Sequence, residues 1–484
     1  MKSKNFSSFG RRRFLGAMAG AVGLTHVLDE VRLSASQIPS APANVRLVSD
    51  ALGLSSEKAV LTAADFSYMG AMRLPTESVD LSFSYGAMTA RKVNGRLHFF
   101  LAQSITTNFT PTPHAVVEVA DTGDYRTNYL DAPRAPIVQN WGDIYQGKRL
   151  SWDSSGGVIN LNSSQAMVTS LLYRDGRLYW SYYDGYNVAG RRDWHLGFTA
   201  LNGGPSSMQA YGPWRTIDGV HKLGHYCVAL PDGSLGLSAS LSSGNVQSSW
   251  GPILKGGVSY PTETTRAGVG SPDLAAPHTY VEHGYPTGDL NDDGTLVSGR
   301  TLKSMAREGD YVWHSISSSS GQANASRNYL DPVKNGGRGS WTDIDYFNGL
   351  IYLNLPNKHG VLFVGSMGTG HTWYGRPDDC GHGFSSASLT SGTGPNASSF
   401  RSWWGVYDPA KMAAVAAGQR NPTFPPDVQF DPSRAIAPLK LGAGRSFGGM
   451  HFDSETSMLY VLSREAEQVG LMYIPLIHVF RVVG

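Results

Sequence analysis

The sequence predicts an all-β protein with the fold of a seven-bladed β-propeller. The composition is the first observation: 57 of the 484 residues are glycine, about 12% against a usual ~7%, and only 16% are charged, against a usual ~25%. The second observation is a series of short alternating strands that recur along the chain. This profile excludes a coiled coil, a polytopic membrane protein and a mostly disordered chain.

The strand-like segments share one form, in which a turn dipeptide precedes alternating apolar residues. Asn-Gly and Asp-Gly before such a run are the strongest short signals of a β-hairpin. The segments of the series begin at Asn94, Asp175, Asp232, Asn348, Lys358 and Ser457. At roughly 55–65 residues for each four-stranded sheet with its loops, the chain has room for seven blades. A pair of packed sheets or a β-helix is the competing architecture.

The two ends of the predicted domain are both apolar strands. Residues 66–74 form the first, and residues 476–482 form the last. If they pair within one blade, the ring closes and no sheet edge is left exposed. We therefore expect a propeller closed by its N- and C-terminal strands.

The N-terminus has the pattern of an export signal. Arg11, Arg12 and Arg13 precede Phe14-Leu15, and a short, weakly hydrophobic stretch follows at residues 16–24. This order resembles a twin-arginine signal peptide, and the apolar stretch is too short and too glycine-rich to span a bilayer. We expect a signal at residues 1–38, with cleavage between residues 35 and 43. A single propeller domain is expected at residues 39–484, periplasmic or extracellular and not inserted in the membrane after processing.

The charge of the chain is unevenly distributed. The first 35 residues carry six basic and two acidic side chains, a net charge of +4, so the remainder of this +2 chain carries −2. A mature chain near neutrality has no general electrostatic attraction for nucleic acid or for an anionic membrane. Any anionic partner must therefore be met by a local basic cluster.

One helix is expected as an insertion in the β scaffold. Asp408 can cap it, Pro409 takes the first helical position, and the following residues 411–417 are rich in alanine. Gly418 is expected to end it.

The two cysteines lie in mirrored pairs with histidine. His225 precedes Cys227 by two residues, and Cys380 precedes His382 by two. In a strand, residues two apart point to the same face, so the four side chains can form the Cys2His2 set that suits a structural zinc ion. A Cys227–Cys380 disulfide is the alternative in an exported protein, and two unrelated buried cysteines are another.

A possible calcium loop lies at residues 289–294. It matches the first half of the D-x-[DN]-x-[DN]-G pattern of an oxygen-ligand loop. The twelfth position is Arg300 rather than glutamate, so a solvent-facing acidic turn is the competing interpretation.

The middle third of the chain gathers histidine, tyrosine and arginine in loops expected between blades. His195, His221, His278, Tyr280, His283 and Arg300 are among them, although each histidine alone could have a purely structural role. Together they suit β-elimination on a uronic-acid glycan. Arginine can neutralise the carboxylate that acidifies the C5 hydrogen, and a histidine or tyrosine can remove that proton while another protonates the leaving oxygen.

Four stretches resemble secreted bacterial seven-bladed propeller proteins. They are residues 65–75, 361–370, 404–409 and 475–480. Among propellers of this size the functional analogy is with the ulvan lyases, which cleave a sulfated algal polysaccharide by β-elimination with two histidines, a tyrosine and an arginine. By residue type and chain order, this resemblance implies that Arg300 neutralises the carboxylate, that Tyr280 or His195 act as base and acid, and that His221 orients them. Tyr260 with Arg266 is an alternative second pair.

The expected function is therefore that of an exported polysaccharide lyase on an anionic, uronate-containing glycan. A non-catalytic carbohydrate-binding propeller and a glycoside hydrolase are the alternatives. Hydrolysis would require two carboxyl groups about 5–10 Å apart, and no acidic pair in the sequence is clearly placed for that.

Overall fold

The computed structural model describes most of the chain from residue 58 onward. Outside the described residues lie 1–57, 83, 85, 105–113, 149, 153–157, 161–165, 185–194, 218–222, 240–252, 268–273, 283–288, 291–295, 298–303, 309–310, 318–322, 331–345, 376–393, 421, 423, 425, 433–435 and 437–446. For some residues within strands only the backbone is described. Residues Asn44–Gly484 form one compact unit.

The described residues form five principal sheets, each running from an inner strand outward. The first contains β3 (Met88–Val93), β4 (Arg96–Ala102), β5 (Val116–Ala120) and β6 (Ile137–Gly142). The second contains β9 (Ala166–Arg174), β10 (Arg177–Asp184), β11 (His195–Ala200), β12 (Gln209–Ile217) and the short β16 (Leu274–Ala275). The third contains β13 (Leu223–Ala229), β14 (Leu235–Ala239), β15 (Ile253–Val258) and β17 (His278–Glu282).

The last two sheets include strands from distant parts of the chain. The fourth contains β23 (Tyr346–Asn354), β24 (Lys358–Gly375), β25 (Gly394–Tyr407) and β26 (Val428–Phe430), extended along β24 by β1 (Ala59–Val60), β20 (Ser304–Glu308), β21 (Tyr311–Ser317) and β22 (Ala323–Leu330). The fifth contains β27 (Phe447–Asp453), β28 (Met458–Val469), β29 (Met472–Val482) and β2 (Phe66–Arg73). Two hairpins stand apart, β7 (Leu150–Trp152) with β8 (Val158–Asn160) and β18 (Asp289–Leu290) with β19 (Leu296–Val297).

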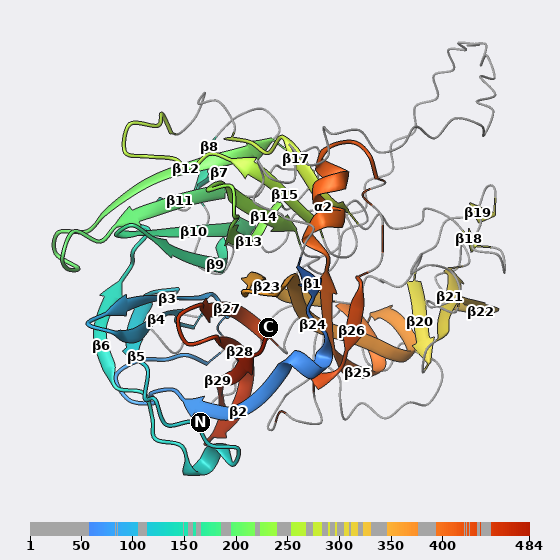
Figure 1. Ribbon diagram of the computed structural model, residues 1–484, viewed down its shortest axis with the longest axis horizontal. Coiled ribbons are helices and arrows are strands. Elements are labelled where there is room, and N and C mark those ends of the chain that lie inside the picture. The colour runs from blue at the N-terminus through green and yellow to red at the C-terminus, as the bar shows by residue number, and fades with distance from the viewer. Residues whose placement is uncertain are drawn as a thin grey trace, which may run out of the picture. The chain divides into compact units, whose positions relative to one another are not determined.

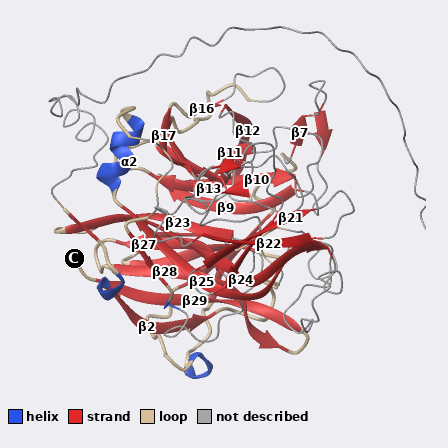
Figure 2. Ribbon diagram, turned by 90° about the vertical axis from the view of Figure 1, so that its right-hand side faces the viewer, coloured by secondary structure: helices blue, strands red, loops and turns tan. Residues whose placement is uncertain are grey.

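The five sheets form a closed ring. Each inner strand contacts the next in the order β3, β9, β13, β23, β27, and β27 contacts β3 again; Figure 1 shows these strands nearest the common centre. A hydrophobic cluster fills each of the five interfaces between neighbouring sheets. This arrangement is a β-propeller, and Figure 2 shows how completely strands dominate it.

The predicted seven blades are not confirmed, because the described residues supply five sheets to the ring. The prediction divided the chain length by the size of one blade. Much of that length lies instead in connections and extensions: the chain between β17 and β23, residues 283–345, includes β18–β22 yet adds no inner strand.

The predicted closure by the terminal strands is confirmed. Phe66 of β2 lies opposite Val482 of β29, and the antiparallel pairing continues to Arg73 opposite Leu476. The outermost strand of the fifth sheet therefore comes from the N-terminal side and the other three strands from the C-terminal side.

The predicted turns are mostly confirmed. Asn94 and Gly95 have φ of 50° and 79°, the left-handed conformation of a tight hairpin turn, and Asp175-Gly176 repeats it. The predicted turn at Asn348-Gly349 is wrong, because both residues lie inside β23 at a break in its register with β24. Gly349 allows a close approach instead: a Cβ there would lie 2.6 Å from the carbonyl oxygen of Gly448.

The expected helix is confirmed as α2 (Pro409–Ala416). The Asp408 carboxylate accepts a hydrogen bond of 2.8 Å from the amide of Ala410, and Gly418 follows with φ of 72°. Two 3-10 turns, η1 (Ala63–Asp65) and η2 (Tyr129–Asp131), complete the described elements. Among the described residues, none of the helices combines the length and the apolar character needed to cross a bilayer.

Candidate functional site

The ring has two distinct ends. We call the end where the inner strands begin the leading end, and the end where they finish the trailing end. In the first three sheets and the fifth, the inner strand connects to the second strand at the trailing end by a turn of two to five residues, as at Asn94-Gly95. The second strand then returns to the leading end, where residues 185–194 and 240–252 connect it to the third strand. The third strand runs back to the trailing end, where residues 121–136, 259–277 and 408–427 connect it to the fourth, so both ends carry long loops of the kind that often serve binding and catalysis.

The predicted His195 lies at the leading end. It is the first residue of β11 and pairs with Tyr182 of β10 on one side and Arg215 of β12 on the other. Two residues beyond Tyr182, Asp184 lies opposite Ala166, the first residue of the inner strand β9. This end of β10 is therefore the leading end. Only the backbone of His195 is described.

The predicted His221 and Arg300 fall outside the described residues, but the strands that flank them are described. Residues 218–222 join β12 to the start of the inner strand β13. Arg300 lies between β19, which ends at Val297, and β20, which begins at Ser304 and pairs with β24 of the fourth sheet. The described strands therefore place His195 and the start of β13, which follows His221, at the leading end of two adjacent sheets, the second and third, and they do not place Arg300.

The predicted Tyr280 has a different setting. Its side chain is buried in the hydrophobic cluster between the third and fourth sheets, and a Cβ on Gly256 would lie 2.3 Å from its ring. Burial raises the pKa of the phenol above its usual value, so it stays protonated at neutral pH. This environment favours a packing role for Tyr280.

The predicted zinc set is described only at Cys227. This thiol is buried in an apolar cluster with Leu235 and Leu237 and forms no disulfide within the described residues. Burial raises its pKa to about 11, although hydrogen bonds with Ser181 and Ser170 act in the opposite direction. A thiol held neutral in this way is a poor metal ligand unless a cation replaces the proton.

The other zinc candidates are not described as side chains. His225 lies in β13 where the register with β14 shifts between Leu223 and Tyr226, so simple alternation does not fix its face. Cys380 and His382 lie outside the described residues, as does most of the candidate calcium loop at residues 289–294. Within the described part of the chain, no three His, Cys, Asp or Glu side chains are grouped to hold a metal ion. Zinc and calcium stay predictions.

A cavity of about 610 Å³ lies on the axis of the ring. All five inner strands line it, mostly through their second halves, and Pro231 and Ser454 from the following turns place it toward the trailing end. Hydrogen bonds join the strands around it: the amide of Tyr173 donates to Thr89 Oγ1 at 3.1 Å, and the amide of Cys227 donates to Ser170 Oγ at 2.9 Å. The cavity is thus a rigid, preformed feature of the propeller.

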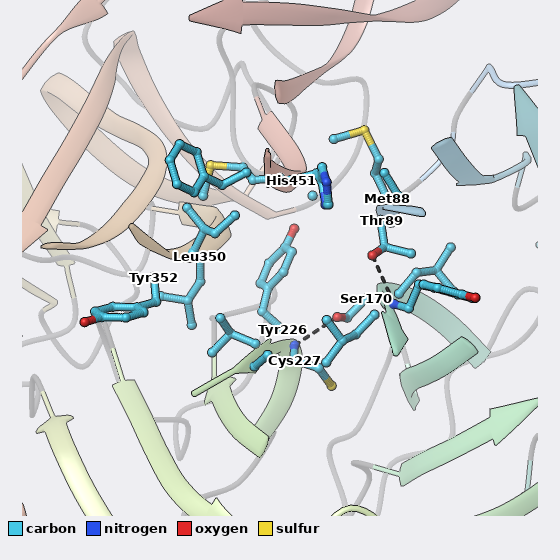
Figure 3. Close-up of a pocket in the computed structure, with 18 of the residues that line it drawn as sticks. Met88, Thr89, Ser170, Tyr226, Cys227, Leu350, Tyr352 and His451 are labelled. Atoms are coloured by element: carbon cyan, nitrogen blue, oxygen red, sulfur yellow. Dashed lines mark hydrogen bonds between the residues drawn. The ribbon is translucent and has the colours of Figure 1, made fainter. Parts of the chain in front are cut away.

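His451 and Tyr226 are the prominent polar side chains of this cavity. Figure 3 shows the hydroxyl end of Tyr226 directed toward the imidazole of His451. Burial lowers the pKa of His451 to about 4, with Lys92 adding to this effect and Asp453 opposing it. His451 is therefore neutral at physiological pH, with one nitrogen that donates and one that accepts.

Charged groups near the cavity are paired outside it. Lys92 contacts Asp453 at 3.1 Å and Glu455 at 2.8 Å. Glu118, which is fully buried, accepts hydrogen bonds from Arg91, and its Oε1 lies 2.9 Å from Nδ1 of His98. None of the described residues that line the cavity is an aspartate, glutamate, lysine or arginine.

Sequence reasoning did not find His451 or Tyr226 as cavity residues. Each lies in an inner strand, and β27 carries no turn dipeptide or motif that marks it as innermost. The order of strands within each sheet could have indicated them, since the first strand of every unit faces the axis.

No protein-family profile and no curated protein matches this sequence. Solved structures do resemble it. A glycosyl hydrolase from Bacteroides ovatus is 9% identical over 87% of this chain and 92% of its own, with a TM-score of 0.35. A protein of unknown function from Dyadobacter fermentans is 10% identical over 87% and 100%, with a TM-score of 0.36.

A third similar structure belongs to the GH130 family, described as mannoside phosphorylases that include glycoside hydrolases acting on β-1,2 mannosidic linkages in Candida mannan. It is 8% identical over 87% of this chain and 96% of its own, with a TM-score of 0.33. At these scores the similarities carry no conclusion about the activity of this chain.

Proposed function

We propose that this chain is a carbohydrate-active enzyme that cleaves a uronate-containing glycan by β-elimination at the leading end of the propeller. One observation carries the proposal. His195 begins β11 at the leading end of the second sheet, and β13, the strand that follows His221, begins at the same end of the adjacent third sheet.

The chemistry assigns a role to each residue. Arg300 pairs with the uronate carboxylate and makes the C5 hydrogen more acidic. His195 takes that proton, the C4–O bond breaks, and a C4–C5 double bond forms. The leaving oxygen must then be protonated. Tyr280 is buried in the core, so we assign this step to His221.

The export prediction fits this function, because a polysaccharide is met outside the cytoplasm. We propose that residues 1–38 are a twin-arginine signal that directs the mature chain there. Expression with and without Arg11 and Arg12 replaced by lysine, followed by fractionation of the cells, tests this. Retention of the variant in the cytoplasm supports the signal, and unchanged export contradicts it.

The decisive test is ultraviolet absorbance during incubation with ulvan, alginate, pectin and glycosaminoglycans. A lyase creates an unsaturated end that absorbs, so we expect a rising signal with one of them. Arg300→Ala and His195→Ala should each lower the rate by about 10²–10⁴-fold. Arg126→Ala is the matched control, because Arg126 is 55% exposed and paired with Asp124 in the connection from β5 to β6.

Two outcomes contradict the proposal. New reducing ends without absorbance would indicate a hydrolase. Binding without any product would indicate a non-catalytic carbohydrate-binding propeller.

A further inference from the structure

The cavity on the propeller axis has the size of a ligand site. Its volume of about 610 Å³ falls within the usual ~300–1,000 Å³ of small-molecule pockets. It lies toward the trailing end, whereas His195 and the start of β13, which follows His221, lie at the leading end. It is therefore a feature distinct from the proposed site of glycan cleavage.

The lining disfavours a charged ligand. Among the described lining residues there is no aspartate, glutamate, lysine or arginine. Lys92 is paired with Asp453 and Arg91 with Glu118, and Arg464, whose charge acts on Tyr226, donates from Nε to the carbonyl oxygen of Ser84. A carboxylate or an ammonium group in the cavity would lose its hydration without gaining a partner of opposite charge. The ligand that fits is uncharged.

The cavity also offers a hydrogen-bonding group that the protein itself does not use. Within the described part of the chain, no hydrogen bond engages the imidazole nitrogens of His451, a half-buried side chain that lines the cavity. These nitrogens are therefore available to a molecule in the cavity. A hydroxyl group, which both donates and accepts, complements the neutral imidazole with its one donor and one acceptor.

The remaining lining supplies both polar and apolar contacts. The side chains of Thr89 and Ser170 carry hydroxyl groups, and Tyr226, which Figure 3 shows between them and His451, contributes an aromatic ring. An aromatic ring beside neutral hydrogen-bonding groups suits a molecule with hydroxyl groups on its rim and C–H groups on its faces. A neutral sugar has this chemistry.

We propose that the axial cavity binds a neutral sugar of one or two rings, with His451 as its central hydrogen-bonding partner. This site is separate from β-elimination and stands whether or not the chain is a lyase.

Calorimetric titration of the full mature chain tests the proposal. The ligands are glucose, galactose, mannose, xylose, rhamnose and the disaccharides cellobiose and maltose, with glucuronate and galacturonate as charged counterparts. We expect at least one neutral sugar to bind, and His451→Ala to weaken that binding about tenfold, as the loss of a neutral hydrogen bond would. His278→Ala is the matched control, because His278 is partly exposed in β17 and does not line the cavity.

A second measurement does not depend on a variant that folds. Diethyl pyrocarbonate modifies neutral imidazoles, and peptide mass spectrometry reports each histidine separately. The bound neutral sugar should slow modification of His451 several-fold and leave His278 unchanged. Glucuronate or galacturonate bound at the leading end should not protect His451.

Three results would overturn the proposal. One is that no neutral sugar of the panel binds. Another is that binding persists unchanged in His451→Ala. The third is that the uronates protect His451 as well as the neutral sugars do.

Discussion

Phe66 lies opposite Val482, so the first long strand of the described chain completes the same sheet as the last. The strand β29 is consequently held on both sides, by β28 and by β2. Closure of the ring therefore depends on side chains near the C-terminus that pack into the neighbouring sheet. This dependence can be measured.

We expect Phe480→Ala to destabilise the propeller by about 3–5 kcal/mol. The Phe480 ring is buried, with its centroid 5.0 Å from that of Trp404 in the fourth sheet and 5.2 Å from that of Tyr68 in β2. Denaturant unfolding followed by tryptophan fluorescence measures the change. Val483→Ala is the control, because Val483 is 56% exposed and should change stability by less than about 0.5 kcal/mol. Equal effects of the two variants would contradict this account of closure.

Gly448→Ala should destabilise the junction of the fifth and first sheets by about 1–3 kcal/mol. A Cβ at Gly448 would lie 2.4 Å from the carbonyl oxygen of Gly86, which is backbone and cannot rotate away. Gly204→Ala provides the comparison, since no atom lies within 4 Å of a Cβ at that position. Thermal unfolding of both variants tests this, and a tolerated alanine at Gly448 would show that the inner strands can separate without cost.

Replacing Glu118 by glutamine should cost about 2–3 kcal/mol, the range for hydrogen bonds to charged groups. The carboxylate is fully buried and accepts from Arg91 at 2.8 and 2.9 Å and from Trp141 at 2.8 Å. Glutamine has the same shape, but its NH2 group replaces one carboxylate oxygen. That NH2 group would face the N–H donors of Arg91 or Trp141 and could not accept from them. Glu455→Gln, which removes a 75% exposed carboxylate paired with Lys92, should cost less than about 1 kcal/mol. A similar loss in both variants would contradict the role of burial.

The stability of the propeller should fall as the pH is lowered from about 6.5 to about 4 because of His451. Its pKa is about 4 in the folded chain and about 6.5 when unfolded, so within this window the unfolded chain binds the proton and the folded chain does not. The contribution of His451 to the free energy of unfolding is complete above pH 6.5. It decreases by ~3 kcal/mol in all as the pH falls toward 4.

His451→Gln separates this effect from other titrations. Denaturant unfolding at several pH values should give a flatter dependence between pH 4 and 6.5 in the variant. The carboxyl groups with lowered pKa values, Asp65, Asp408, Asp453 and Glu263, titrate in both proteins and therefore cancel in the comparison. The same slope in both would show that His451 is not shielded from water as described.

The sequence alone determined the local structure, because local structure depends on residues close together in the chain. The Asp175-Gly176 turn adopts the left-handed conformation that its residues prefer, and Asp408 caps the helix it was expected to cap. The pairing of the terminal strands was also predictable, since an unpaired apolar edge is unfavourable wherever it lies.

The number of blades and the position of the site depended on the tertiary structure. Five sheets rather than seven form the ring of described residues, because contacts between strands distant in sequence decide which segments become inner strands. Tyr280 has the residue type of a catalytic group but lies in the core between two sheets. His451 carries no sequence signal at all, and only the closing of five sheets around one axis places it in the lining of the axial cavity.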